Sequence, residues 1–459
     1  KNYTYKLSGN IQDSVIKLDK PFKNNIIIPK VENINFKKTN INFKYNKENK
    51  NSILIEGQFS INKNDKFNKF KIINSFNKKN SKFNLDFDFI DTLKFDFINY
   101  KKDNSKKANI KSEFNIHKNK IDIKMINFKE GKSILNISGL RIDAKNRIEN
   151  FKNVEVKTYV NGVENNNFKV SFGKKIVIQG KTYDSTNLIK NINKNDKNSP
   201  FGKLNKLIEI NFKSVLTKLS IPISNFNLLG EIKKGKLINI SSKSEFPGNN
   251  YLDITLKKDK NSSKKRLEIF SDLPRVVLAD YNFFNSVKGG KLLFVSNFDE
   301  QINLSNLKIE NFKVIDAPAF AKLLSLADFG GMIDLLNGEG LSFDIMEIKT
   351  SKDKDVLKID ELYAIGSSIS ILIEGYVENK SGLVSLKGTM VPAKNLNKLI
   401  SKIPVLGKIL VPKEIGEGAF GVSFKIKGLP GDMKTTVNPI KTLTPRFITR
   451  ALEKRKKNN

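Results

Sequence analysis

Few side chains in this chain of 459 residues could act as an acid, a base or a nucleophile. The sequence contains no cysteine and a single histidine, His117. Thiol nucleophiles, thiolate zinc sites and iron–sulfur clusters are therefore excluded. His117 lies between Ile116 and Lys118, on the polar side of a stretch in which apolar and polar residues alternate. We expect it to be a solvated side chain and not a general base.

Two other patterns have the residue types of known sites but the wrong surroundings. Residues 416–421 match the pattern G-x-G-x-x-G, but a dinucleotide site needs a strand before the glycines and a helix after them. Here strand-like alternation follows the glycines. Asp86, Asp88 and Asp96 alternate with phenylalanines, as on the wet face of a strand, and nothing selects two of them as a glycosidase pair. The sequence predicts no catalytic residue, no metal site and no cofactor, so we do not expect an enzyme.

The elements that carry these residues are predicted to be β-strands from residue 1 to about residue 315. Apolar residues recur at every second position, which gives each strand one apolar and one polar face. Asn161-Gly162 lies between two such runs and predicts a type I′ hairpin. The turns are short and rich in Asn, Lys, Asp and Gly, so we expect neighbouring strands to pair antiparallel.

The number of strands limits the architecture. At roughly 10–14 residues per strand and turn the chain holds on the order of 25–30 strands, whereas ordinary open sheets rarely exceed about 10. Several sandwiches, a repeat array or one long curved sheet would accommodate them. Short turns and the lack of a fixed repeat favour a mainly β fold with one long, strongly bent antiparallel β-sheet that forms an apolar, taco-like groove. We expect three segments: residues 1–170 and 171–315, both groove, and residues 316–459, a C-terminal region.

The predicted helices are few, short and close to the C-terminus. Apolar residues follow helical spacing within residues 317–336 and 393–403, and Pro445 favours a last, basic helix over residues 445–457. The first two segments are too apolar to stay bare, so we expect them to cap the last strands and to close or gate one mouth of the groove. The predicted capping residues are Phe320, Leu323, Leu324, Met332, Ile333, Leu396, Leu399 and Ile400.

The charge of the chain is strongly positive, with 82 Lys and Arg against 47 Asp and Glu and a formal net charge of +35. Of the basic residues 75 are Lys and 7 are Arg, whereas proteins that read nucleic-acid phosphates favour Arg forks and aromatic stacking. Abundant Lys, Asn and Ile are what an A/T-rich genome encodes at solvent-facing positions. We therefore do not expect a nucleic-acid partner, and attraction to anionic lipid surfaces remains an alternative source of the charge.

No membrane-spanning helix is predicted from the sequence. The longest apolar stretches, residues 317–336 and 396–412, are interrupted by charged residues or proline and lack the roughly 20 clean residues that a span needs. The chain begins at Lys1 without a Met. We therefore expect a fragment or a processed chain, from which an N-terminal anchor is missing.

A series of motifs in the C-terminal third is more specific than composition. In order, the motifs are Gly289-Gly290, residues 307–318, 323–331, 336–343, 388–397 and 403–410, Gly416 and Gly418, Gly428, and residues 437–439 and 443–445. Their order and spacing resemble the AsmA-like C-terminal region of the YhdP type, found in proteobacterial envelope proteins. The likeness covers about residues 289–450 and extends weakly to residue 170. Thr444-Pro445-Arg446 departs from the Pro-Gly usual there, which affects the exact end of the domain.

The resemblance implies a bridge-like lipid transfer protein of the AsmA-like group, which also includes TamB. Such proteins have an inner-membrane helix and a long periplasmic β-groove with an apolar lining. The expected function is phospholipid transport between the inner and outer membranes, and hence outer-membrane lipid homeostasis. The expected location is the periplasm, with the missing N-terminal helix in the inner membrane. Expected partners are phospholipids, membrane surfaces at the two ends, and envelope proteins.

The lining of the groove is predicted from the apolar positions of the clearest strands. Acyl chains would slide along it while the head groups stay at the wet opening, and each buried CH₂ contributes about 0.8 kcal/mol. The candidates are Phe83, Leu85, Phe87, Phe89, Leu93, Phe95, Phe97, Ile110, Phe114, Ile116, Ile121 and Ile123. Two alternatives remain open: these residues pack together in a closed core, or the protein is an envelope assembly factor or scaffold that lends a sheet edge to outer-membrane proteins.

The basic C-terminal tail is a candidate for contact with a membrane surface. Lysines and arginines near an anionic bilayer each contribute about 1 kcal/mol. The alternative is a frayed, solvated helix. The candidate residues are Arg446, Arg450, Lys454, Arg455, Lys456 and Lys457.

Overall fold

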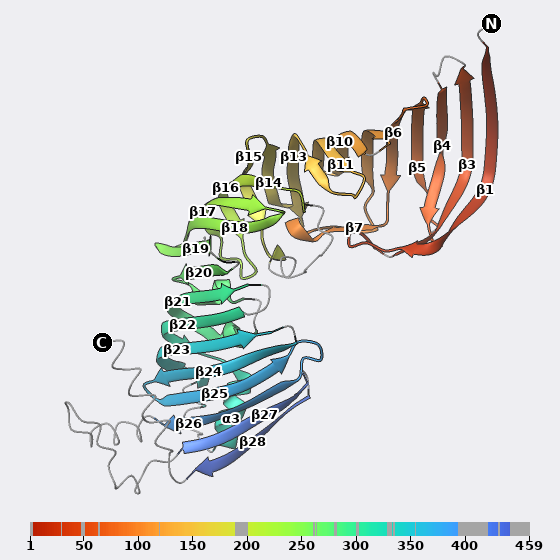
Figure 1. Ribbon diagram of the computed structural model, residues 1–459. Coiled ribbons are helices and arrows are strands. Elements are labelled where there is room, and N and C mark those ends of the chain that lie inside the picture. The colour runs from red at the N-terminus through yellow and green to blue at the C-terminus, as the bar shows by residue number, and fades with distance from the viewer. Residues whose placement is uncertain are drawn as a thin grey trace, which may run out of the picture. The chain divides into compact units, whose positions relative to one another are not determined.

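The computed structural model describes residues 3–28, 30–46, 51–62, 65–118, 120–188, 201–259, 262, 264–279, 282–299, 303–327, 333, 336–353, 355–392, 421–429 and 432–440. Strand accounts for 73% of the structure and helix for 6%, so the prediction of a mainly β fold is confirmed. The chain divides into unit 1, Lys1–Pro247, and unit 2, Gly248–Asn459 (Figure 1). The divisions expected at residues 170 and 315 stay predictions.

Unit 1 is built on a sheet in which most strands pair antiparallel with the next strand of the sequence. The hydrogen-bonded order is β1-β3-β4-β5-β6-β9-β10-β11-β13-β14-β15-β16-β17-β18, and β12 pairs with the end of β11. The bounds are β1 (Thr4–Phe22), β3 (Val31–Asn46), β4 (Asn51–Ile61), β5 (Asn68–Phe76), β6 (Asn80–Phe89), β9 (Ala108–His117), β10 (Lys120–Glu130), β11 (Ser133–Asp143), β12 (Ile148–Asn150), β13 (Asn153–Val160), β14 (Val163–Phe172), β15 (Lys175–Asp184), β16 (Lys206–Leu216), β17 (Ile223–Lys233) and β18 (Lys236–Phe246).

The predicted hairpin at Asn161-Gly162 is confirmed. It joins β13 to β14, with Val160 opposite Val163. Asn161 and Gly162 both have a positive φ, 50° and 81°. A type I′ turn requires a positive φ at both central residues, and Asn and Gly are the residues that adopt it with least strain.

One pair of strands in unit 1 is parallel, so the expectation of antiparallel pairing throughout is wrong at this point. Ile176 of β15 lies opposite Ile208 of β16, and the two strands run in the same direction. Residues 185–205 lie between them in the sequence. A parallel pair needs a crossover of a dozen or more residues and not a hairpin turn, and a connection of that length stands here.

The segment between β6 and β9, residues 90–107, leaves the main sheet, and we call it the strap. Its β7 (Thr92–Phe95) pairs with β2 (Ile27–Ile28) and β8 (Tyr100–Lys102) in a sheet of three strands, and η1 (Asp96–Ile98) joins β7 to β8. The strap residues Leu93, Ile98 and Tyr100 are buried. The lining candidates Leu93, Phe95 and Phe97 therefore lie outside the main sheet, because the chain changes sheets after Phe89.

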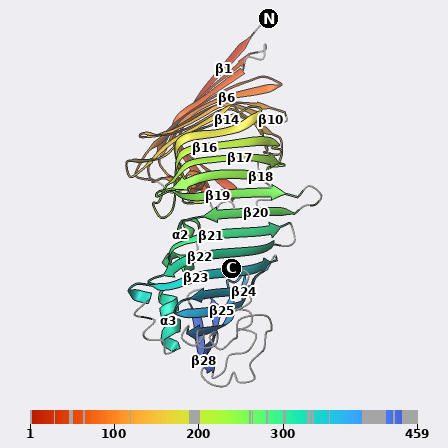
Figure 2. The same ribbon diagram turned by 90° about the vertical axis from the view of Figure 1, so that its left-hand side faces the viewer.

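Unit 2 repeats the antiparallel ladder with longer connections. Its strands pair in sequence order, as Figure 2 shows for β20 to β25. The bounds are β19 (Asn250–Lys258), β20 (Lys265–Ser271), β21 (Val287–Phe298), β22 (Asn303–Val314), β23 (Leu341–Lys352), β24 (Val356–Gly366), β25 (Ile369–Glu378), β26 (Val384–Pro392), β27 (Gly421–Leu429) and β28 (Asp432–Ile440).

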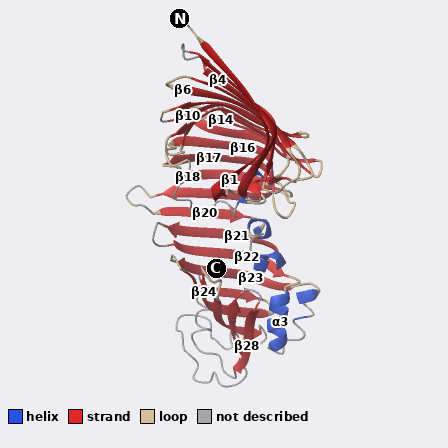
Figure 3. Ribbon diagram, turned by 90° about the vertical axis from the view of Figure 1, so that its right-hand side faces the viewer, coloured by secondary structure: helices blue, strands red, loops and turns tan. Residues whose placement is uncertain are grey.

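Short helices cover part of the sheet of unit 2. They are α2 (Pro274–Val277), η2 (Asn282–Ser286) and α3 (Pro318–Leu326), and Figure 3 shows them on one side of the strands. The helix expected from residue 317 is thus confirmed as α3, where Pro318 opens the first turn. Leu324 of α3 and Ile309 of β22 belong to one buried cluster, and both are fully buried. None of the helices described is long and apolar enough to cross a bilayer.

Candidate functional site

The pairing register of unit 1 collects apolar side chains on one face of the sheet. Residues directly opposite each other in an antiparallel pair point to the same face. Phe83 of β6 lies opposite Phe114 of β9, and Phe87 lies opposite Ile110. The rings of Phe83 and Phe114 stack with centroids 5.1 Å apart. Two predicted lining strands thus combine their apolar sides into one surface, which we call the apolar face.

The apolar face continues onto β10 and β11. Phe114 lies opposite Ile123, and Ile116 lies opposite Ile121, so nine of the twelve predicted lining residues share this face. The nine are Phe83, Leu85, Phe87, Phe89, Ile110, Phe114, Ile116, Ile121 and Ile123.

The exposure of these nine residues lies between that of a core and that of a surface. Phe89 is buried, with 4% of its surface exposed, and Ile116 is exposed at 39%. The other seven are half-buried. A closed core would bury nearly all of them, and isolated surface residues would be more exposed. The apolar face therefore combines side-chain packing with remaining access from one side.

The remaining three predicted lining residues belong to the strap. Leu93 is 4% exposed, and Phe95 packs on Phe128 of β10, with ring centroids 5.6 Å apart. Phe97 lies in η1 and is 62% exposed. Because Phe128 lies opposite Ile110, the strap covers the apolar face near the ends of these strands. Leu93 and Phe95 thus belong to the strap that lies over the apolar face, and they are not part of the sheet that forms this face.

The sequence also contained lining residues that were not singled out. Phe59 of β4 and Phe70 of β5 lie on the apolar face, because Phe70 is opposite Phe87 and its ring meets that of Phe59 at 5.9 Å. Phe59 also meets Phe87 at 6.2 Å, although β5 runs between their strands. Alternate strands are about 9.6 Å apart, so the side chains of Phe59 and Phe87 lean toward each other across β5. The alternation of β4 and β5 would have predicted both residues.

The opposite face of unit 1 carries paired charges. Lys82 lies 2.8 Å from Glu113, and Lys124 lies 3.2 Å from the same carboxylate. Hydrogen bonds from Lys82 and then Lys124 hold the pKa of Glu113 below its usual range. His117 also lies on this side, with its Nδ1 2.7 Å from the side-chain oxygen of Asn80. These groups form an ion-paired polar face.

The three carboxylates considered for acid–base chemistry are all held in ion pairs. Asp86 pairs with Lys111 at 3.0 Å and Asp88 with Lys107 at 2.8 Å. Asp96 of η1 pairs with Lys94 at 2.8 Å. Ion pairing with lysine accounts for these three carboxylates, so no catalytic role is needed to explain them. Among the described residues, no group of three or more histidines and carboxylates could hold a metal ion.

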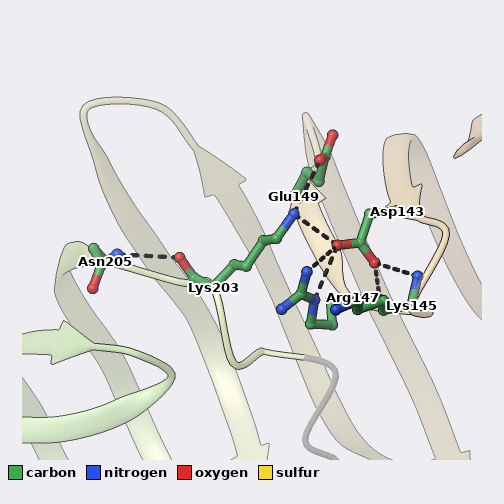
Figure 4. Close-up of polar contacts among 6 residues, drawn as sticks. All are labelled: Asp143, Lys145, Arg147, Glu149, Lys203 and Asn205. Atoms are coloured by element: carbon green, nitrogen blue, oxygen red, sulfur yellow. Dashed lines mark hydrogen bonds and ion pairs between the residues drawn. The ribbon is translucent and has the colours of Figure 1, made fainter. Parts of the chain in front are cut away.

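A second polar cluster connects distant segments at the edge of the unit 1 sheet (Figure 4). The carboxylate of Asp143 accepts hydrogen bonds from the Arg147 guanidinium at 2.8 and 2.9 Å and pairs with Lys203 at 2.7 Å. It also accepts the backbone N–H groups of Lys145 and Arg147 at 2.9 Å. Lys203 reaches Glu149 at 3.6 Å. This cluster joins the end of β11 to the segment before β16.

The predicted capping residues that are described lie in or against the core of unit 2. Leu323 and Leu324 are buried in its main cluster, and Phe320 and Ile333 pack against it. The remaining predictions lie outside the described residues. They concern the capping residues Met332, Leu396, Leu399 and Ile400, the glycine pattern around Gly416, and the tail residues Arg446, Arg450, Lys454, Arg455, Lys456 and Lys457.

No family model, no curated protein and no solved structure matches this chain.

Proposed function

We propose that unit 1 carries phospholipids, with acyl chains on the apolar face and head groups in water. The observation that carries the proposal is the register, which combines the apolar sides of β4 to β11 into one half-buried surface. A large apolar surface with remaining access is typical of a binding site. The contacts among the phenylalanine rings make this surface continuous from strand to strand, as a groove for an acyl chain requires.

The mechanism is passive sliding. Exposing an acyl chain to water costs about 0.8 kcal/mol of free energy for each CH₂. A path outside the membrane must therefore cover the tails throughout. Contacts repeat from strand to strand on the apolar face, so each step exchanges one apolar contact for a similar one. No side chain needs to act as acid, base or nucleophile, and the proposal is a carrier and not an enzyme.

The biological setting of the proposal follows from the resemblance described above. It is a bridge in the periplasm, anchored at the inner membrane, through which phospholipids reach the outer membrane. Envelope proteins and the two membrane surfaces are its proposed partners. The basic tail would face anionic head groups.

The experiment that tests the proposal is photo-crosslinking to lipid. A benzophenone amino acid is introduced at Phe87 on the apolar face or, as the matched control, at Asp86 on the opposite face of the same strand. The purified protein is illuminated with phospholipid vesicles and analysed by mass spectrometry. The proposal expects a phospholipid adduct at position 87 and none at 86. Equal labelling at both positions, or none at either, would contradict it.

A second candidate function, an assembly scaffold for outer-membrane proteins, is favoured by β1. This strand has 19 residues and pairs with β3 on one side. Within the described residues its other side has no strand partner. Such an edge can bind an extended client strand through main-chain hydrogen bonds. Stoichiometric phospholipid in the purified protein would favour the carrier, and a bound client polypeptide without lipid would favour the scaffold.

A further inference from the structure

Exposed lysines follow one end of the strands of the unit 1 sheet. Antiparallel order places the turns β5–β6, β9–β10, β11–β12, β14–β15 and β17–β18 at the same end of the strands. We call this margin of the sheet, where the strands end, the turn edge. These five turns contain lysines but no Asp or Glu, whereas the β3–β4 connection at the same edge, residues 47–50, contains Glu48. The turn lysines are all exposed: Lys78, Lys79, Lys118, Lys145, Lys174 and Lys234.

The strap lies at the opposite edge, and four of its five lysines lie in ion pairs. Lys101 pairs with Asp103 at 2.8 Å, and Lys106 lies 3.6 Å from Glu130. Lys94 and Lys107 pair with Asp96 and Asp88 as described above. The fifth, Lys102, is 1% exposed and donates to the carbonyl oxygens of residues 90, 103 and 106 at 2.6–3.0 Å.

The turn edge shares its richness in lysine with the rest of unit 1. Lys23 and Lys132 are exposed in connections at the opposite ends of the strands, and the ion-paired Asp143 lies at the turn edge itself. Turns at one edge of an antiparallel sheet recur at every second strand, about 10 Å apart. The turn edge is therefore a row of positive charges along the margin of the apolar face.

The strap determines which margin of the apolar face is open. Asn166 of β14 donates to the carbonyl oxygen of Ile98 at 2.6 Å, and Tyr183 of β15 donates to that of Phe97 at 2.8 Å. Together with the contact of Phe95 on Phe128, these bonds hold the strap along the strand ends from β10 to β15. A molecule on the apolar face there meets the strap at one end of the strands and the turn edge at the other.

We propose that the turn edge binds the head groups of anionic phospholipids whose acyl chains lie on the apolar face, so that unit 1 prefers lipids with a net negative charge. This inference rests on the proposed carrier function. Apolar contact alone does not distinguish head groups, whereas lysines near an anionic lipid favour it through charge. The closed strap edge and the open, lysine-bearing edge give the lipid one orientation.

The test compares two triple variants of the full chain with equal charge changes. Lys118→Glu, Lys145→Glu and Lys174→Glu alter the turn edge. The matched control, Lys23→Glu, Lys101→Glu and Lys132→Glu, alters exposed lysines outside it. Uptake of fluorescent phosphatidylglycerol and phosphatidylcholine from mixed vesicles is measured for each protein. We expect the wild type to take up more phosphatidylglycerol than phosphatidylcholine. In the turn-edge triple this uptake ratio should be at least tenfold smaller, with phosphatidylcholine uptake unchanged. The control triple should retain the preference.

The outcomes separate this inference from the proposed function. Lipid uptake without a head-group preference in the wild type overturns the inference alone. An equal loss in both triples also overturns it, because general attraction to the vesicle surface would then explain the preference. A wild type that takes up neither lipid overturns the carrier function itself. The triple with glutamine at positions 118, 145 and 174 should show a smaller loss, because it removes positive charge without adding repulsion.

Discussion

The rings of Phe168 and Phe212 meet edge to face with their centroids 5.6 Å apart, although β15 runs between their strands. The residue of β15 that lies opposite both is Gly180. A Cβ atom at this position would lie 2.4 Å from the Cβ of Phe168 and 2.3 Å from the carbonyl oxygen of Asn167. The contact of the two rings therefore depends on the missing side chain.

The first prediction concerns this glycine. Gly180→Ala should lower the free energy of unfolding by about 1–3 kcal/mol, because overpacking forces the backbone or Phe168 to shift. Urea unfolding at equilibrium measures the change. Gly173→Ala is the control, since a Cβ there would meet its nearest atom at 3.9 Å. Equal stability of the two variants would mean that the ring contact is not tightly packed.

The second prediction concerns the open part of the apolar face. Phe114→Asp should block lipid uptake in a protein that remains folded, because a buried, unpaired charge costs several kcal/mol as the tails pass. Asn115→Asp adds the same charge to the opposite face of β9 and should leave uptake unchanged. Circular dichroism checks the fold and the vesicle assay checks uptake. Unfolding of Phe114→Asp alone would assign Phe114 to a closed core.

Alternation predicted the local strands well but not the sheet to which each belongs. β6 and β9 were predicted from the spacing of Phe83, Phe87, Ile110 and Phe114, because a half-buried strand needs an apolar residue at every second position. The same spacing continues over residues 93–97, where the chain has already left the main sheet. Period 2 describes one strand and its two faces, and it contains no information on the partner strand.

The strap and the parallel pair depend on contacts far apart in sequence. Asn166 holds Ile98 across 68 residues, and the pairing of β15 with β16 follows a connection of about twenty residues. Asn is common in the turns of this chain, so no local signal marks Asn166 as a buried residue. The apolar face was predictable from alternation, whereas the strap that covers it and the edge that it leaves open were not.

The third prediction concerns the attachment of the strap. Asn166 is fully buried and also accepts the backbone N–H of Asp184 at 2.9 Å. Asn166→Leu leaves that N–H without its partner and removes the shorter of two hydrogen bonds to the carbonyl oxygen of Ile98, the other coming from Asn165 at 3.4 Å, which should cost about 1–3 kcal/mol. Hydrogen exchange should then become faster in residues 90–107. Asn227→Leu, at an exposed position of β17, should leave exchange in the strap as it is in the wild type.

The fourth prediction is a dependence of stability on pH at Asp143. The hydrogen bond from Lys203, followed by those from Arg147, lowers the pKa of Asp143 far below its usual value. An acid with a lowered folded pKa stabilises the fold above its unfolded pKa, near 3.9, and this contribution disappears as the pH falls toward the folded value. Asp143→Asn should therefore be less stable than the wild type at pH 6, and the difference should shrink at pH 3.

Urea midpoints at the two pH values check this prediction. Glu149→Gln is the matched control, since Glu149 is exposed and makes one longer contact, 3.6 Å, with Lys203. An exposed pair of this kind contributes little, so the control should follow the wild type at both pH values. A difference between Asp143→Asn and the wild type that stays constant down to pH 3 would show that charge on Asp143 does not stabilise the fold.

The last prediction asks whether α3 is a permanent part of unit 2 or a gate. Leu324 is fully buried, and Leu326, two residues further along the same helix, is 48% exposed. Leu324→Ala should lower the free energy of unfolding by about 2–5 kcal/mol, the usual cost of removing a buried leucine side chain. Leu326→Ala should change it by less than about 0.5 kcal/mol. Urea unfolding measures both, and hydrogen exchange in α3 shows how often the helix opens. A permanent cover predicts that α3 amides exchange as slowly as those of β22. Exchange in α3 that is much faster than in the strands, with little effect of Leu324→Ala on stability, would favour a gate that opens while the sheet stays folded.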